Sequence, residues 1–390
     1  MKKIALFFLI PFLVNCNVED WSIPQTQCAE DIPNLVSGFA KEKLYQQAID
    51  EAVRKGIPGL VLLVSTGEDS LWIGSSGKAK IETNEAMMPC HIHHSASVAK
   101  MYMATAAMLL VEDGLLELDA PIKNYLDEDI VKHIDNCKTA TVRQLLNHTS
   151  GIRDFVLETN FLTDYFNDYF HNYTTADFLK YVYDKPAKFT PGSRAEYSNI
   201  NTVLLTVIID KVAGSHADVI SDRIIKKLDL KNTFYKNEKG YPNPDGLVNS
   251  YWDRYSNGKL ENVTKVAIHF DETNVGHDAM LATAYDYSLF INSLMQGKLV
   301  SHKSLNEMMT WKYDQKDEIY NGLGLLREIT PYGDAIGHAG GNFGVAMQVQ
   351  YYPERDVTIV LCTNISGFFP SPARDEVIAL AKTIENLVMK

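Results

Sequence analysis

Segments with the composition of β-strands lie near the two ends of this chain, and helical patterns fill the region between them. Because strands and helices bury their apolar faces against one another, this order predicts one sheet built from both ends of the chain. A helical region is inserted from Asp119 to about Gly276, and terminal helices would flank the sheet. The expected strands are 59–65, 70–73, 322–328, 345–352 and 357–362, and the expected flanking helices are 41–55 and 372–389.

The size and composition of the chain are those of a globular protein with a large core. It has 390 residues, of which 46% are hydrophobic and 22% are charged. No segment after Val14 begins a run long enough to cross a membrane. The formal net charge of -12 and the lack of a basic run argue against nucleic acid as a partner.

The first residues have the pattern of a secretory signal. Two lysines precede an apolar run over 4–14 that is too short for a membrane span. The run ends in Leu13-Val14-Asn15-Cys16, which resembles the lipobox of a bacterial lipoprotein, although the asparagine replaces the usual small residue. We therefore expect a signal peptide over 1–16, acylation of Cys16 and a tether over 17–39. The protein would be exported to the cell envelope or periplasm and held to a membrane by lipid alone, with ordinary signal cleavage nearby as the alternative.

Cysteines elsewhere in the chain are scattered and show no Cys-x-x-Cys spacing. Export would permit disulfides, and buried free thiols are equally compatible with the sequence. Sequence alone leaves the pairing open. These cysteines are Cys28, Cys90, Cys137 and Cys362.

A serine and a lysine stand at the start of a long apolar run. Ser97-Val98-Ala99-Lys100 precedes the run over 101–111. On a helix, residues three apart share a face, so the lysine amine would lie beside the serine hydroxyl. There it could take the hydroxyl proton and make Ser97 a nucleophile, which is the Ser-x-x-Lys arrangement of acyl-transfer enzymes. The helix N-terminus would stabilise an oxyanion, and its dipole and burial would both lower the pKa of Lys100.

The same spacing occurs at two other places, and local context separates the three. Ser75-Ser76-Gly77-Lys78 is a glycine-rich segment read as a turn between strands, and Ser256-Asn257-Gly258-Lys259 is a turn by composition. Only Ser97 continues into a helix. The alternative for Ser97 is an ordinary helix N-cap with an exposed Lys100.

Tyr197-Ser198-Asn199 lies at a turn that leads into another long apolar helix. The Tyr197 hydroxyl could relay a proton from Ser97 to a leaving group, because a cationic lysine stabilises a phenolate. Asn199 could hold Lys100 or a substrate amide. The alternative is a turn tyrosine followed by a capping asparagine.

The glycine-rich segment Gly337-His338-Ala339-Gly340-Gly341 precedes the strand expected at 345–352. Its small residues would let a substrate backbone approach, and His338 could hydrogen-bond that backbone. The Gly341 amide could form an oxyanion hole with the amide of Ser97. The alternative is a hairpin turn that carries a surface histidine.

Together these motifs resemble the class C β-lactamase and D-alanyl-D-alanine carboxypeptidase family, in which they occur in the same order and near the same spacing. The resemblance covers about residues 40–390. It includes Leu-Leu-Asn-His-Thr-Ser-Gly at 145–151 and the pattern Phe-x-Pro-Gly followed by Tyr-Ser-Asn over 189–199. The nucleophile elbow Gly-x-Ser-x-Gly is absent, which argues against an α/β-hydrolase fold.

The resemblance implies the serine β-lactamase and penicillin-binding-protein fold. This is an α/β (α+β) sandwich whose antiparallel sheet is flanked by terminal helices, with an all-helical lobe over about 119–280. Ser97 would be acylated, and Lys100 and Tyr197 would share the proton transfers. No metal and no organic cofactor are implied. The substrate-binding and oxyanion residues would be Asn199, His338, Gly340 and Gly341.

Two positions depart from the pattern of the family. His338 replaces a lysine that many members carry, and a neutral histidine is a weaker partner for the carboxylate of a β-lactam or a D-Ala terminus. Gly276-His277-Asp278-Ala279 stands where a Gly-Gly pair is usual. We expect Asp278 to narrow or acidify the rim of the cleft.

We therefore expect an exported serine hydrolase that acts through an acyl-enzyme on an amide or ester. Its substrate would be a small molecule or a peptide, such as a fragment of peptidoglycan, and the enzyme would be D-Ala-D-Ala carboxypeptidase-like or esterase-like. A β-lactamase is the alternative within the family, and a non-catalytic protein that binds peptidoglycan or a peptide is an alternative outside it. A metal-dependent hydrolase would have to use His91, His93 and His94 beside Cys90, where no second ligand cluster is visible.

Overall fold

The computed structural model describes residues 40–390 apart from 68–69, 236–243, 274–275, 317 and 368. The predicted signal peptide, the lipidation site at Cys16 and the tether lie outside the described residues. Among the helices that are described, none combines the length and the apolar composition needed to cross a bilayer.

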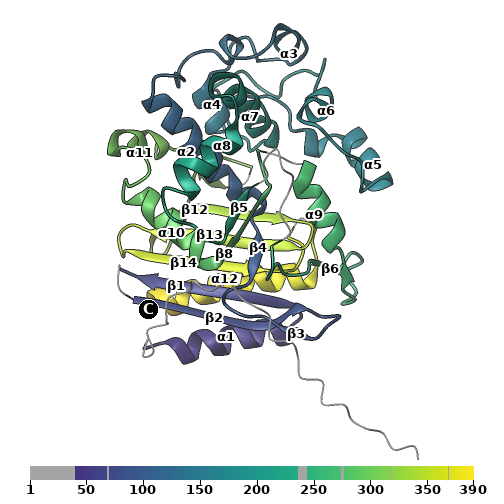
Figure 1. Cartoon of the computed structure of the whole chain (residues 1–390), viewed down its shortest axis with the longest axis vertical. Helices are drawn as coiled ribbons and strands as arrows, with labels where there is room; N and C mark the ends of the chain where they lie inside the picture. Colours follow the sequence, from purple (N-terminus) through teal and green to yellow (C-terminus); the bar gives the residue numbers. More distant parts are fainter. Residues whose placement is uncertain (1–39, 68–69, 236–243, 274–275, 317, 368) are drawn as a thin grey trace, which may run out of the picture.

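An antiparallel sheet forms the centre of the described part of the chain, with nine strands in the order β3-β2-β1-β14-β13-β12-β11-β10-β9 (Figure 1). Three of its strands come from the N-terminal part of the chain and six from the C-terminal part. The two parts meet where β1 pairs with β14, with Leu62 opposite Leu361. This confirms the sheet predicted from the distribution of strand-forming segments. The strands are β1 Gly59–Thr66, β2 Ser70–Lys80, β3 Glu85–Ala86, β9 Lys312–Asp314, β10 Ile319–Asn321, β11 Leu326–Thr330, β12 Gly333–Asn342, β13 Val345–Tyr352 and β14 Val357–Thr363.

The two terminal helices, α1 (Glu42–Arg54) and α12 (Pro372–Met389), pack against each other and against one face of the sheet (Figure 1). Ile49 of α1 and Leu380 of α12 share a buried cluster with Leu361 of β14. Both helices bury an apolar stripe and expose a polar one, and both lie where the sequence predicted flanking helices.

The opposite face of the sheet carries α10 (Ala284–Met295), and α2 (Ala99–Glu112) runs between that layer and the helical lobe. Residues 99–110 of α2 are all buried, which explains why this helix is apolar on every side rather than amphipathic. The other helices are α3 Glu128–His133, α4 Val142–Leu146, α5 Thr159–Asn167, α6 Thr175–Lys180, α7 Asn199–Ala213, α8 His216–Ile220, α9 Thr264–Thr273 and α11 His302–Met308.

Short elements connect the sheet to the lobe. β4 (Ile92–His94), β8 (Met280–Thr283) and β5 (Thr233–Tyr235) form a small antiparallel sheet, and β6 (Tyr251–Trp252) pairs with β7 (Glu261–Asn262). The remaining turns of helix are η1 Ala96–Val98, η2 Ile122–Asn124, η3 Phe155–Leu157 and η4 Ser221–Ile225.

Three glycine-containing segments differ from their sequence predictions. Ser75-Ser76-Gly77 was predicted to turn but belongs to β2, because these residues pair with β1. The segment from Gly337 to Asn342 belongs to the long strand β12, so the hairpin-turn alternative is wrong; pairing with β13 outweighs the low strand propensity of glycine. Of the strand expected at 322–328, only 326–328 are strand, as the start of β11; residues 322–325 form the turn that follows β10, with Gly324 at φ 73°.

Candidate active site

Ser97 lies in η1, the short turn between β4 and α2. The residue before it, Ala96, has φ 43°, a left-handed conformation that is uncommon for a residue with a side chain. Lys100 is the second residue of α2, and its Nζ donates to Ser97 Oγ and to the carbonyl of His277, each over 2.9 Å. The lysine is only 3% exposed. The interpretation of Ser97 as an N-cap beside an exposed lysine is therefore wrong.

The two other Ser-x-x-Lys segments lack this geometry. The Ser75 hydroxyl donates to the carbonyl of Met87 over 2.9 Å, and the Ser256 hydroxyl donates to the carbonyl of Pro370 over 3.1 Å. In the strand that holds Ser75, residues three apart point to opposite faces, so Lys78 points away from it. Of the three candidates, only Ser97 has its lysine as a partner.

The buried position of Lys100 changes its protonation. Burial lowers its pKa to about 8, while the carboxylates of Asp278 and Asp154 act in the opposite direction. Part of the lysine is therefore neutral near physiological pH. In that state the Ser97 hydroxyl can donate to the amine across the same contact, which is the arrangement that a general base requires.

The side chain of Tyr197, which lies in the turn before α7, is also close to Lys100. Its ring centroid lies 5.4 Å from Lys100 Nζ, 4.4 Å from the ring of His148 and 6.1 Å from the ring of His338. Its backbone N–H donates to Asp314 Oδ2 over 3.0 Å, which fixes the turn. The structure thus brings Ser97, Lys100 and Tyr197 together from separate parts of the chain.

Asn199 is the first residue of α7 and lines the cavity described below. Its Nδ2 donates to Asp154 Oδ2 over 2.9 Å, and Asp154 Oδ1 accepts from the backbone N–H of Val156 over 3.2 Å. The carboxylate that holds Asn199 was not predicted, because a single aspartate before a short loop gives no sequence signal. Burial raises the pKa of Asp154.

β12 brings His338, Gly340 and Gly341 alongside Ser97. Its pairing with β11 ends at Gly337, and from His338 to Asn342 the described strand pairs only with β13. A Cβ at Gly340 would lie 2.5 Å from the carbonyl oxygen of Ser95 and 3.2 Å from the backbone nitrogen of Ser97. Glycine is therefore needed for the strand to approach η1. Gly341 and Ser97 line the same cavity, as a pair of oxyanion-hole amides would.

Substitution of Gly340 by alanine tests this close approach. The added methyl group must displace the backbone at Ser95, so we expect about 1–3 kcal/mol of destabilisation and a large loss of kcat. Thermal unfolding and ester hydrolysis measure the two effects. Ala339→Ser on the same strand, where the side chain is exposed, is the matched control. Unchanged kcat in Gly340→Ala would contradict the assigned packing.

His338 is buried and uncharged at neutral pH. Burial, together with the charge of Lys100, lowers its pKa to about 3. Its Nδ1 lies 2.6 Å from the carbonyl oxygen of Ala339, so a neutral ring carries its proton on Nδ1. His338 can therefore offer a hydrogen bond in this site but not a positive charge.

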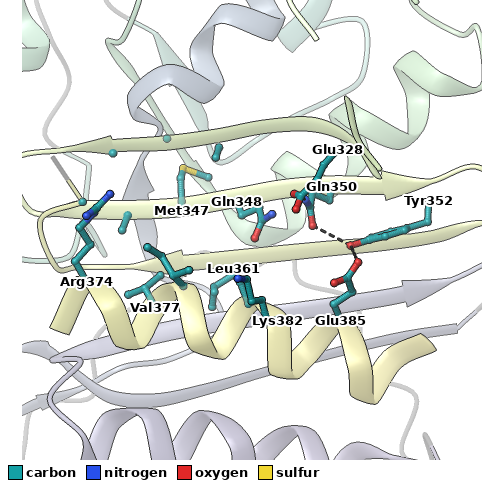
Figure 2. A pocket seen from close by; sticks show the side chains of 17 residues that line it. Glu328, Met347, Gln348, Gln350, Tyr352, Leu361, Arg374, Val377, Lys382 and Glu385 are labelled. Atoms are coloured by element: carbon teal, nitrogen blue, oxygen red, sulfur yellow. Dashed lines mark hydrogen bonds between the residues drawn. The ribbon is translucent and has the colours of Figure 1, made fainter. Parts of the chain in front are cut away.

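A cavity of about 170 Å³ opens beside Ser97. The rest of its wall is apolar and mostly aromatic: Phe161, Leu162, Tyr165 and Phe166 come from α5, Val156 from η3, Phe270 from α9, and Phe343 from the turn after β12. A larger groove of about 450 Å³ lies between α12 and the outer face of β12 to β14 (Figure 2). Gly340 and Gly341 line that groove, but Ser97 and Tyr197 line the smaller cavity and not the groove. The smaller cavity is therefore the candidate active site.

A family model described as Beta-lactamase matches residues 44–383. The chain belongs to the β-lactamase family. Penicillin-binding protein 4* of Bacillus subtilis (strain 168) is 25% identical over 323 residues, which cover 78% of this chain and 67% of that protein. Protein flp of Staphylococcus aureus (strain MW2) is 29% identical over 198 residues, which cover 49% of this chain and 38% of that protein. The match to protein flp thus extends over well under half of that relative's length.

Solved structures of this family confirm the predicted sandwich with its helical lobe. The D-stereospecific amidohydrolase from a Streptomyces species is 26% identical, with a TM-score of 0.74 over 83% of this chain and 94% of that one. The D-amino acid amidase from Ochrobactrum anthropi SV3 in complex with D-phenylalanine is 23% identical, with a TM-score of 0.76 over 88% of this chain and 98% of that one. Members of the family are serine hydrolases, and this chain is assigned to that class.

Asp278, which stands where the family usually has a Gly-Gly pair, was expected at the rim of the cleft but lies inside the cavity. It is 5% exposed and lines the cavity with Ser97. Burial raises its pKa to about 7, while Lys100 acts to lower it. The next residue, Ala279, has φ 70°, which is a conformation that glycine adopts without strain. Behind Asp278, Asn342 Nδ2 donates to Asp271 Oδ1 over 3.3 Å, and sequence analysis did not predict this buried aspartate.

The histidines considered as metal ligands point to separate partners. His91 Nε2 lies 3.1 Å from Glu85 Oε1, and His94 Nδ1 lies 2.6 Å from Asp271 Oδ2. Within the described residues, no group of three or more ligating side chains is placed to hold a metal ion. Cys90 is disulfide-bonded, and Cys137 and Cys362 are free and buried.

Proposed function

We propose that the protein is an exported serine hydrolase that cleaves a small amide or ester through an acyl-enzyme on Ser97. The observation that carries the proposal is the 2.9 Å contact between Lys100 Nζ and Ser97 Oγ beside a cavity of about 170 Å³. A buried amine with a lowered pKa next to a serine hydroxyl is the arrangement of an activated nucleophile.

In the proposed reaction, neutral Lys100 accepts the Ser97 proton as Oγ attacks the carbonyl carbon of the substrate. The amides of Ser97 and Gly341 donate to the oxyanion. Tyr197, beside Lys100, passes the proton to the leaving nitrogen or oxygen, and the acyl group stays on Ser97. A water molecule then attacks this ester while Lys100 and Tyr197 act in the reverse sense, which releases the acid and restores the serine.

Charge in the cavity favours an amide or ester without a carboxylate over a β-lactam or a D-Ala-terminated peptide. Such carboxylates need a cation, whereas His338 is neutral and the Lys100 amine is directed at Ser97 and His277. Among the described residues that line the cavity, the ionisable carboxyl is Asp278, which would repel a carboxylate. The 26% identity to a D-stereospecific amidohydrolase also supports an amide substrate.

Incubation with p-nitrophenyl acetate, p-nitrophenyl butyrate and a fluorescent penicillin, followed by intact mass measurement, tests the proposal. We expect turnover of the esters, an acyl adduct when the reaction is stopped early, and little labelling by penicillin. A folded protein that neither turns over the esters nor gains mass would overturn the proposal. Activity lost with a chelator would instead favour the metal-dependent alternative.

Export and lipidation at Cys16 are part of the same proposal, supported by the lipobox-like run over 13–16. In a bacterial host, the full chain is expected in the membrane fraction with a lipid adduct on its N-terminus. Cys16→Ala should be recovered without that adduct. A native chain found only in soluble form and without lipid would contradict the anchor.

A further inference from the structure

Asp278 is placed where a substrate would meet it. Its side chain lines the cavity that Ser97 also lines, and it is 5% exposed. The carbonyl of the preceding residue, His277, accepts from Lys100 Nζ over 2.9 Å, and the same amine contacts Ser97 Oγ. The backbone at Asp278 is therefore linked to the nucleophile by two consecutive hydrogen bonds.

The carboxyl group of Asp278 has unused hydrogen-bonding capacity. Asn342 donates to it, but Oδ1 has no hydrogen-bond partner within the described part of the chain. Among the described ion pairs, none joins Asp278 to Lys100, whose amine is directed at Ser97 and His277. A buried carboxylate oxygen without a donor is unfavourable, so a donor supplied by a ligand would stabilise it.

The surroundings of Asp278 are apolar and aromatic. Phe161, Tyr165, Phe270 and Phe343 form the cavity wall around it. Its volume of about 170 Å³ is below the ~300–1,000 Å³ of pockets for drug-sized ligands. The cavity therefore fits a small acyl group with an apolar side chain, and the rings would also favour a cation near their faces.

We propose that Asp278 binds the ammonium group of the acyl part of the substrate, so that the preferred substrates are amides or esters of small apolar α-amino acids. In such a substrate, the ammonium is carried by the carbon next to the reacting carbonyl, which suits an anion placed close to Ser97. The inference rests on the proposed function, because the acyl part must reach Ser97 for its ammonium to be recognised.

Electrostatics of the site are consistent with this role. Burial raises the pKa of Asp278 to about 7, so a bound ammonium would favour the ionised carboxylate. His338 is neutral, and although the charge of Lys100 lowers the pKa of Asp278, the Lys100 amine is directed at Ser97 and His277 and leaves the Asp278 carboxylate without a direct cationic partner. A charge-assisted hydrogen bond in such an enclosed site contributes more than a neutral one.

A matched pair of substrates tests the inference. Leucine p-nitroanilide, in both enantiomers, and 4-methylpentanoic acid p-nitroanilide differ only in the amine. At about pH 7 the leucine amine is largely protonated. We expect kcat/KM for one leucine enantiomer to exceed that of the deaminated compound by about 10- to 100-fold, mainly through KM.

Variants at Asp278 assign the preference to the carboxylate. Asp278→Asn should bring the ratio of the two kcat/KM values close to one. Asp278→Glu, which keeps a carboxylate, should retain part of the preference for the leucine substrate. Asp154→Asn is the matched control: it also removes a buried carboxylate that acts on Lys100, but both Asp154 oxygens already have donors. Asp154→Asn should change kcat/KM for both substrates by the same factor, so the ratio of the two values should stay as in the wild type. Asp278→Ser replaces the asparagine variant if that protein does not fold.

The possible outcomes separate the inference from the proposed function. Equal or faster turnover of 4-methylpentanoic acid p-nitroanilide by the wild type would overturn the role of Asp278 and leave the hydrolase intact. A preference for leucine that survives in Asp278→Asn would also overturn it. No turnover and no acyl adduct with any anilide or ester would contradict the proposed function itself.

Discussion

Replacement of Ser97 by alanine is expected to abolish ester and amide turnover, with kcat lowered by at least ~10³-fold. The acyl adduct should vanish as well, because no oxygen remains to carry it. Lys100 keeps its contact with the carbonyl of His277, so we expect the variant to fold with a Tm close to that of the native protein. Intact mass, ester hydrolysis and thermal unfolding measure the three effects.

The chain supplies its own control for this experiment. Ser75 has a lysine at the same spacing but lies in β2 and donates to Met87. Ser75→Ala should therefore retain native turnover. An adduct that persists in Ser97→Ala would show that another residue is the nucleophile, and peptide mapping would locate it.

The arrangement of the sheet could be predicted because its signals are local. The apolar runs of β1, β13 and β14 and the amphipathic patterns of α1 and α12 each identify an element without knowledge of its partners. That these runs lie at both ends of the chain then requires the ends to pair. The convergence of Ser97, Tyr197 and His338 was expected from the family resemblance, since no local rule connects positions so distant in sequence.

The parts that escaped prediction depend on contacts between distant segments. β12 is rich in glycine and has a low intrinsic strand propensity, but β13 on one side and η1 on the other require small residues there. Asp154 and Asp271 became visible only when the fold buried them beside Asn199 and His94. Asp278 was noticed as a departure from the family, and only the structure places it inside the cavity rather than on its rim.

Loss of the Lys100 amine is expected to lower kcat/KM by ~10²- to 10⁴-fold, since general-base assistance contributes on that scale. The pH profile gives the sharper test. Burial lowers the pKa of Lys100 to about 8, and only the neutral amine can accept the Ser97 proton. Wild-type kcat/KM should therefore rise as the pH increases through about 8 and level off above it. In Lys100→Ala that step should disappear, leaving slow turnover that increases only with hydroxide concentration.

Two further variants separate the proton-accepting role of Lys100 from its charge. Lys100→Arg keeps a cation in the site but cannot lose its proton, so it should be as impaired as the alanine variant. Recovery of activity in Lys100→Arg would instead mean that the positive charge stabilises the transition state. Lys78→Ala removes the lysine that follows Ser75 at the same spacing and should leave the profile unchanged. Full activity in Lys100→Ala would remove Lys100 from the mechanism and leave Tyr197, whose ring centroid lies 5.4 Å from the amine, as the candidate base.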